Sequence, residues 1–155
     1  MPIYDRLKAL NIELPDAVAP VANYVPYVIT GNLIVISGQI SLGPDGLIKG
    51  TLGKDITLED ASLAARQCGL NILAQCDGAC REIGKTLDDV NRIVRLGGFV
   101  ASTPDFFDQP KVINGASDLM VEVFEDKGRH ARAAVGVPAL PLGAAVEIDA
   151  MIEIG

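Results

Sequence analysis

Arg132 and Glu147 are the two side chains of this sequence whose types and spacing most suggest chemistry. Arg132 begins a run of small residues, and the alternation of a strand would place Arg132, Ala134 and Gly136 on one face. Glu147 lies between two apolar residues of the next predicted strand. On adjacent strands, the guanidinium could bind a carboxylate and the glutamate could order a water molecule. The alternative is a structural salt bridge between the same two residues.

The cysteines do not form a metal or disulfide pattern. Cys68, Cys76 and Cys80 fall within one short stretch, and His130 is the single histidine. A zinc site would therefore lack ligands, and three thiols cannot all pair with one another. We expect structural thiols and no metal, in a protein of the reducing cytoplasm.

Length and composition favour one acidic domain over residues 1–155. The net charge is -7, a balance that repels nucleic acid and anionic membrane surfaces. No apolar run is long enough to span a bilayer, and charges in the first residues argue against a secretory signal. The hydrophobic content of 49% and the mean hydropathy of +0.31 are high, which indicates a full core or a surface covered by a partner.

Hydrophobic periodicity and turn residues predict an α+β fold in the order β-β-α-β-α-β-β after a short N-terminal helix. That helix, over 5–11, and a connector would occupy residues 1–19. The other predicted elements are a hairpin at 24–30 and 33–36, a loop at 41–55, helices at 57–83 and 110–126, and strands at 91–101, 130–137 and 144–154. We expect a mixed sheet with both long helices on one face, and its apolar strands require cover on the other face too.

Several short segments follow the order and spacing of a known family. They are Tyr24, Gly31-Asn32, Ser37-Gly38-Gln39-Ile40, Asn114, His130-Ala131-Arg132, Leu140-Pro141 and Val146-Glu147-Ile148. Over roughly residues 20–154 the chain resembles the RidA (YjgF) reactive-intermediate deaminases, and it is most similar to their longer, endoribonuclease-like branch. The resemblance implies a chorismate-mutase-like fold and a homotrimer whose sheets form a central barrel, with active sites in the clefts between subunits.

The same resemblance implies a hydrolytic deaminase that converts small 2-imino or enamine acids to 2-keto acids and ammonia. It places the carboxylate clamp on Arg132 and the positioning of the hydrolytic water on Glu147. An imine is already electrophilic, so orientation and charge neutralisation can supply the acceleration. Neither a metal nor an organic cofactor is then required.

Four substrate-binding positions carry over from the family in the same way. Tyr24 would line the cleft, while Ser37 and Gly38 would frame it at a strand end. The backbone carbonyl of Ala134 would hold water or the imine nitrogen. These positions come from the family match and not from spacing alone.

Two further candidates are Asn114 in the second long helix and His130 just before Arg132. The shorter deaminases have a proline where this chain has His130, so the imidazole would either bind substrate or lie at the rim of the cleft. Asn114 matches an asparagine of the family, although the interval that follows it is longer here.

Two other classes of function remain open. A non-catalytic trimer that binds a small carboxylate ligand would need Arg132 and the cleft but would not need Glu147. An endoribonuclease would need a basic groove for phosphates, and K-G-R-H-A-R over 127–132 is the one concentrated basic run. The acidic balance of the chain ranks that function third.

Overall fold

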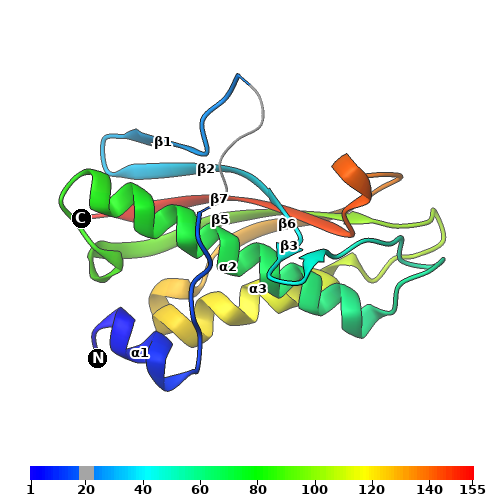
Figure 1. The fold of residues 1–155 in the computed structure, drawn as a ribbon, viewed down its shortest axis with the longest axis horizontal. Helices are drawn as coiled ribbons and strands as arrows, with labels where there is room; N and C mark the ends of the chain where they lie inside the picture. The colour runs from blue at the N-terminus through cyan, green and yellow to red at the C-terminus, as the bar shows by residue number, and fades with distance from the viewer. Residues whose placement is uncertain (18–22) are drawn as a thin grey trace.

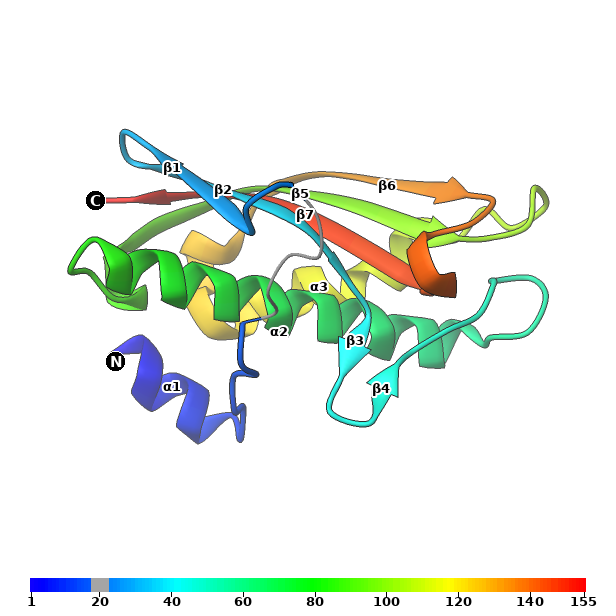
Figure 2. The ribbon, with the colours of Figure 1, turned by 45° about the horizontal axis from the view of Figure 1, so that its top comes forward.

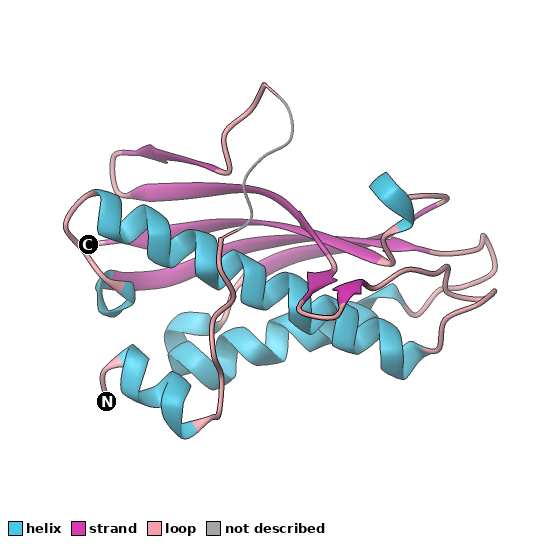
Figure 3. Ribbon diagram, in the orientation of Figure 1, coloured by secondary structure: helices cyan, strands magenta, loops and turns pink. Residues whose placement is uncertain are grey.

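The computed structural model describes residues 1–17 and 23–155, and it confirms the α+β fold and the predicted order of elements (Figures 1 and 3). The elements are α1 (Ile3–Ala9), β1 (Tyr27–Thr30), β2 (Leu33–Ile40), β3 (Leu42–Gly43), β4 (Gly46–Leu47), α2 (Leu58–Glu82), β5 (Val90–Ala101), α3 (Gln109–Phe124), β6 (Ala131–Val137) and β7 (Val146–Ile154). Short 3-10 helices occupy Leu87–Asp89, Glu125–Gly128 and Pro141–Gly143. The last residues of the predicted N-terminal connector lie outside the described residues.

The main sheet is mixed, as predicted, with the strand order β1-β2-β7-β5-β6. Every neighbouring pair is antiparallel except β5 and β6, because α3 carries the chain back across the sheet between them. The strands of Arg132 and Glu147 are therefore not adjacent. β5 lies between β6 and β7, so the prediction that the two strands are neighbours is wrong. β7 lies between β2 and β5, where both of its edges are paired.

α2 and α3 cover one face of the sheet and pack closely on each other (Figure 2). The Thr57 hydroxyl caps α2 by accepting the Asp60 N–H at 3.1 Å. A Cβ placed on Gly69 of α2 would lie 2.9 Å from Leu119 of α3, and one on Gly115 would strike a carbonyl of α2. These glycines allow the two backbones to approach, which offsets the cost of glycine within a helix.

The opposite face of the sheet is open in the described chain and carries both charged and apolar side chains, with Glu147 and the Arg95–Asp149 ion pair among the charged ones. Val28, Val135 and Met151 project from β1, β6 and β7 with exposed fractions of 51%, 45% and 38%. Met151 alternates along β7 with residues buried under the helices, and Val28 alternates along β1 with the partly buried Tyr27 and Ile29. This is the face for which the sequence predicts cover by a further layer.

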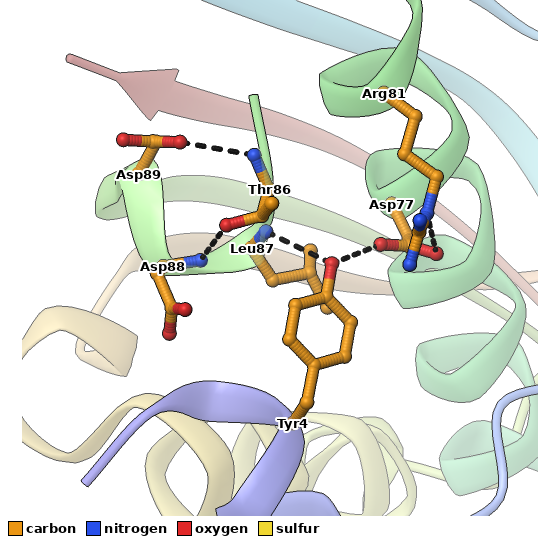
Figure 4. A network of polar contacts seen from close by, with 7 residues as sticks. All are labelled: Tyr4, Asp77, Arg81, Thr86, Leu87, Asp88 and Asp89. Atoms are coloured by element: carbon orange, nitrogen blue, oxygen red, sulfur yellow. Dashed lines mark hydrogen bonds and ion pairs between the residues drawn. The ribbon is translucent and has the colours of Figure 1, made fainter. Parts of the chain in front are cut away.

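α1 begins and ends two residues earlier than predicted. It cannot continue to residue 11, because Asn11 adopts a left-handed backbone conformation at φ 56. A polar cluster fastens it to the body (Figure 4). The Tyr4 hydroxyl donates to Asp77 and accepts the Leu87 N–H at 3.2 Å. Arg81 binds Asp77 at 3.0 Å and stacks over the Tyr4 ring. Burial and the Asp77 carboxylate raise the pKa of Tyr4 to about 12.

Candidate functional site

Arg132 lies on edge strand β6, on the face covered by α3. Its register partner Leu96 is fully buried under the helices, which places the arginine on that same side. The Nη1 atom donates to Asn114 Oδ1 at 2.8 Å and to Ser117 Oγ at 3.1 Å. The Nη2 atom makes a longer contact of 3.4 Å with the Pro110 carbonyl. The first turns of α3 therefore hold one edge of the guanidinium.

The other edge of the Arg132 guanidinium has no acidic partner within residues 1–17 and 23–155. No carboxylate of this part of the chain forms an ion pair with it, and its Nε–H donates to no acceptor there. The Nε and Nη2 atoms form the side-on fork that binds a carboxylate through two parallel hydrogen bonds. The geometry leaves this fork for a ligand.

His130 precedes β6 and contacts the arginine through a serine. Its Nδ1 lies 2.6 Å from the Gly128 carbonyl, and its Nε2 lies 2.8 Å from Ser117 Oγ. Sequence reasoning selected Asn114, His130 and Arg132 and missed Ser117. The missed signal is helical spacing, because Ser117 follows Asn114 by three residues and so shares its face of α3.

Ala134 lies two residues beyond Arg132 on β6 and is half-buried against the core. The Val137 carbonyl accepts the Ser102 N–H and so points toward β5. Successive residues of a strand direct their carbonyls to opposite edges, and Ala134 precedes Val137 by three residues, so the Ala134 carbonyl points to the free edge of the sheet. It is accessible there to a ligand or a water molecule.

Glu147 lies on β7 opposite Phe99 of β5 and on the other face of the sheet from Arg132. Its neighbours Val146 and Ile148 are fully buried under the helices, as the alternation predicts. The side chain is half-buried, and burial raises the pKa of its carboxyl, with a further contribution from the charge of Asp149. Arg132 does not offset this effect.

Gly38 and Ser37 lie beside Glu147, where the pairing of β2 with β7 is interrupted by a bulge between Ile36 and Gln39. A Cβ on Gly38 would lie 3.0 Å from Glu147 Cδ, so this glycine provides the space for the carboxylate. The bulge also carries β2 through to residue 40, beyond its predicted end.

Tyr24 is held near the same bulge by the segment that follows it. The Ser37 hydroxyl donates to the Val25 carbonyl at 2.7 Å, and the Ser37 N–H donates to the Pro26 carbonyl at 2.9 Å. The Tyr24 side chain is half exposed. The chain therefore brings the segment after Tyr24 to Ser37 at the bulge of β2, where Gly38 lies against Glu147.

The predicted residues thus form two groups in one chain. We call Asn114, His130 and Arg132, together with Ser117, the arginine group, and Tyr24, Ser37, Gly38 and Glu147 the glutamate group. The groups lie on opposite faces of the sheet, so the predicted polar floor and the alternative Arg132–Glu147 salt bridge are both wrong within a single chain.

A cavity of about 290 Å³ opens beyond the arginine group, where β5 and β6 end and α3 begins. Gly136, on the same face of β6 as Arg132, forms part of it together with Gln109, Phe106 and Phe107. A Cβ on Gly136 would strike the Ser102 hydroxyl and the Gln109 amide, so glycine keeps this end open.

Between residues 1 and 17 and from 23 onward, no three His, Cys, Asp or Glu side chains are grouped so that they could hold a metal ion. In the same part of the chain, none of the helices has the length and apolar character needed to cross a bilayer.

The whole chain is similar to known proteins. Residues 4–154 match the model of a family described as "YjgF/chorismate mutase-like, putative endoribonuclease". Protein TCP17 of Trypanosoma cruzi is 47% identical over 96% of this chain and 92% of its own length. The crystal structure of Atu1372 from Agrobacterium tumefaciens, 46% identical, covers 99% of this chain and 92% of its own, with a TM-score of 0.89.

A second solved structure connects the chain with the family that its motifs resemble. RidA of the Antarctic bacterium Psychrobacter is 28% identical, with a TM-score of 0.57, over 90% of this chain and 94% of its own. The family match, the fold and the order of motifs agree: the chain belongs to the YjgF/RidA family of chorismate-mutase-like proteins.

Proposed function

We propose that this protein hydrolyses small 2-imino or enamine acids to 2-keto acids and ammonia. The observation that carries the proposal is the Arg132 guanidinium, which α3 holds by one edge while its carboxylate-binding fork has no acidic partner in the described chain. A cation in this state is suited to a ligand that brings its own carboxylate.

The reaction needs only water and a group that moves its proton. Water adds to the imine carbon while Glu147 takes a proton from it and passes a proton to the nitrogen, which gives a carbinolamine. The carbinolamine hydroxyl then loses its proton through Glu147 to the nitrogen, the C–N bond breaks, and ammonia leaves a 2-keto group. Burial raises the pKa of Glu147, which brings its carboxyl nearer to the range where it can both accept and return a proton.

The proposed active site lies between subunits of a homotrimer. Two observations support this assembly: the arginine and glutamate groups lie on opposite faces of one sheet, and the open face carries exposed Val28, Val135 and Met151. Association over that face would bury the apolar side chains. Because Arg132 lies on the edge strand β6, a neighbouring subunit that reaches this edge could place its glutamate group near the arginine group. The three free cysteines are suited to the reducing cytoplasm, where we place the protein.

Imine decay tests the proposal directly. An amino-acid oxidase generates 2-imino acids from small, aliphatic and aromatic amino acids, and their decay is followed with and without the protein. We expect faster decay for at least one class, and equal decay for all three would reject the deaminase. Sedimentation gives the mass of the assembly, and a monomer at micromolar concentration would reject the interfacial site.

A second candidate is a trimer that binds a carboxylate ligand without turnover. It is favoured by the completeness of the arginine group within one chain, which needs no contribution from Glu147. An endoribonuclease ranks third because the basic run is partly neutralised: Asp126 forms ion pairs with Arg129 at 3.6 Å and with Arg92 at 3.8 Å. If the protein binds a small carboxylate ligand through Arg132 but does not accelerate the decay of any imine, the second candidate is correct.

A further inference from the structure

We propose that Ser117 and His130 are positioning residues that orient the Arg132 guanidinium for a carboxylate ligand. This inference rests on the proposed role of Arg132. It adds a serine that the family motif does not include, and it moves His130 from the substrate to the support of the arginine. The contacts that carry it form one chain of hydrogen bonds from Gly128 to Arg132.

The first link fixes the tautomer of His130. The Gly128 carbonyl can only accept a hydrogen bond, so Nδ1 at 2.6 Å from it must carry a proton. Gly128 is buried, and a Cβ there would lie 2.1 Å from the Met120 carbonyl, so glycine lets this turn pack closely on α3. In the neutral ring the lone pair then lies on Nε2.

The second link sets the direction of the Ser117 hydroxyl. With its lone pair on Nε2, His130 accepts the Ser117 proton across 2.8 Å. The lone pairs of Ser117 Oγ are then left for Arg132 Nη1, at 3.1 Å. A serine without the imidazole could rotate its hydroxyl away, and a rotating hydroxyl is a poorer acceptor for a cation.

The third link completes the orientation of the guanidinium plane. Nη1 carries two protons, and Asn114 Oδ1 accepts the one that Ser117 does not. Because the guanidinium is planar, two fixed acceptors at Nη1 also fix the direction of the Nε and Nη2 fork. A carboxylate then binds a side chain that has already lost its rotational freedom, and this preorganisation strengthens binding.

The consequence is an effect on ligand affinity more than on the chemical step. Arg132 binds the carboxylate both before and during the reaction, so loosening it weakens the ground state and the transition state alike. A hydrogen bond to a charged group contributes enough that its loss should weaken binding roughly 10-fold. Ser117 and His130 act through one path, so their effects should not add.

The test measures binding of 2-oxobutyrate, a simple 2-keto acid, by calorimetry, together with imine decay, on the trimer as purified. The variants are Ser117→Ala, Ser117→Thr, His130→Phe and the double variant Ser117→Ala/His130→Phe. Ser62→Ala is the matched control, since Ser62 is a half-buried helical serine of α2 that packs against Gly115 of α3 and forms no hydrogen bond with the arginine group in the described chain. Arg132→Ala reports on the proposed function itself.

We expect Ser117→Ala and His130→Phe each to raise the Kd and the KM roughly 10-fold while kcat changes less than about 3-fold. The double variant should be no worse than either single variant, and Ser117→Thr, which keeps a hydroxyl, should recover most of the affinity. Ser62→Ala should behave as the unmodified protein. Ser117→Ala removes only one oxygen, so it decides the matter even if His130→Phe does not fold.

Two results would overturn the inference, and they differ in what they leave standing. If Arg132→Ala loses binding while Ser117→Ala binds as tightly as the unmodified protein, the positioning role is wrong and the proposed function stands. If the unmodified protein neither binds 2-oxobutyrate nor accelerates imine decay, or if Arg132→Ala matches it, the proposed function is wrong and the inference falls with it.

Discussion

The arginine group and the glutamate group solve the same problem, a charged side chain near apolar surroundings, in opposite ways. Arg132 lies under α3 with acceptors from Asn114, Ser117 and Pro110 around it. Glu147 is half-buried on the open face, accepts no hydrogen bond from the described residues, and has the like charge of Asp149 nearby. One charge is stabilised by its own chain and the other is not.

This difference indicates where an outside partner is needed. A cation with one edge held and one edge unoccupied is already shaped for its ligand. A half-buried carboxyl with a raised pKa is stabilised either by keeping its proton or by contacts that a second subunit supplies. The arginine group is therefore complete in one chain, and the glutamate group is the half that assembly would complete.

The largest expected effect comes from removing the held charge. Arg132→Ala should lose nearly all of the acceleration, on the order of 10³-fold, because it removes the fork that binds and orients the carboxylate. Arg132→Lys should recover little, since a point charge cannot make two parallel hydrogen bonds. Imine decay measures both, with Arg129→Ala, an exposed arginine three residues away, as the control. If the activity of Arg132→Ala were within a few fold of that of the unmodified protein, Arg132 would not be the group that binds and orients the carboxylate.

Next in size is the change Glu147→Gln, which keeps the shape of the side chain and removes its charge. We expect a rate loss of about 10²–10³-fold with 2-oxobutyrate binding retained, because Arg132 lies on the other face of the sheet and does not depend on this carboxylate. Calorimetry and sedimentation check binding and assembly on the same sample. A fully active Glu147→Gln variant with unchanged assembly would exclude a catalytic role for this residue.

The raised pKa of Glu147 also gives the rate a direction with pH. If the carboxylate form takes the proton from water, the rate should fall as pH drops through that pKa, which lies above the ordinary value of 4.5. The folded state holds its proton more tightly than the unfolded chain, so the contribution of this group to stability is present at low pH and is lost as pH rises through the raised pKa. Rate profiles and melting curves between pH 4 and 8 should therefore change in opposite directions, and Glu147→Gln should remove both trends.

A smaller effect is expected from Gly38→Ala, which changes only the space beside Glu147. The added methyl group would lie 3.0 Å from the carboxyl carbon and would push the side chain from its position. We expect roughly a 10-fold loss in kcat with ligand affinity unchanged, since a small displacement of a positioned group lowers rates while Arg132 remains in place. Gly78→Ala is the control, because no atom lies within 4 Å of its added Cβ. Loss of affinity in Gly38→Ala would mean that the glutamate group also contributes to ligand binding, contrary to the division of roles between the two groups.

Local sequence patterns predicted correctly that Arg132, Ala134 and Gly136 share one face of their strand and that Glu147 faces away from its two apolar neighbours. Val146 and Ile148 are buried and Glu147 points away from them, as alternation requires. Helix limits could be placed closely where a cap is present, as at Thr57. These features depend on near neighbours in the chain, which is why the sequence is informative about them.

The order of the strands could not be obtained in the same way. Nothing local to Arg132 or Glu147 indicates that β5 will lie between their strands, since that arrangement follows from the crossover of α3 and from pairing at a distance. Ser117, in contrast, could have been predicted from the sequence. It follows Asn114 by three residues on the same helix, and its contact with Arg132 requires only that the arginine point toward that helix. The separation into two groups is a tertiary result.

The smallest effect is expected outside both groups, in the cluster that fastens α1. Tyr4→Phe removes the hydroxyl that donates to Asp77 and accepts from Leu87, at a cost of about 1 kcal/mol, or a fall in Tm of about 2–4 °C. Imine decay and ligand affinity should not change, because α1 contacts neither Arg132 nor Glu147. Tyr27→Phe is the matched control, since its hydroxyl binds Glu82 at an exposed position.

The same hydroxyl predicts how the stability depends on alkaline pH. Burial and the Asp77 carboxylate raise the pKa of Tyr4 to about 12 from 10.0, so between these values the folded chain keeps a proton that the unfolded chain has lost. The contribution is fully present below pH 10 and disappears as pH rises through 12. Melting curves across this range should fall less steeply for Tyr4→Phe than for the unmodified protein, with activity at neutral pH equal in both. A Tyr4→Phe variant that loses imine turnover would show that α1 is coupled to the site. The activity would then depend on a third region of the chain besides the arginine and glutamate groups.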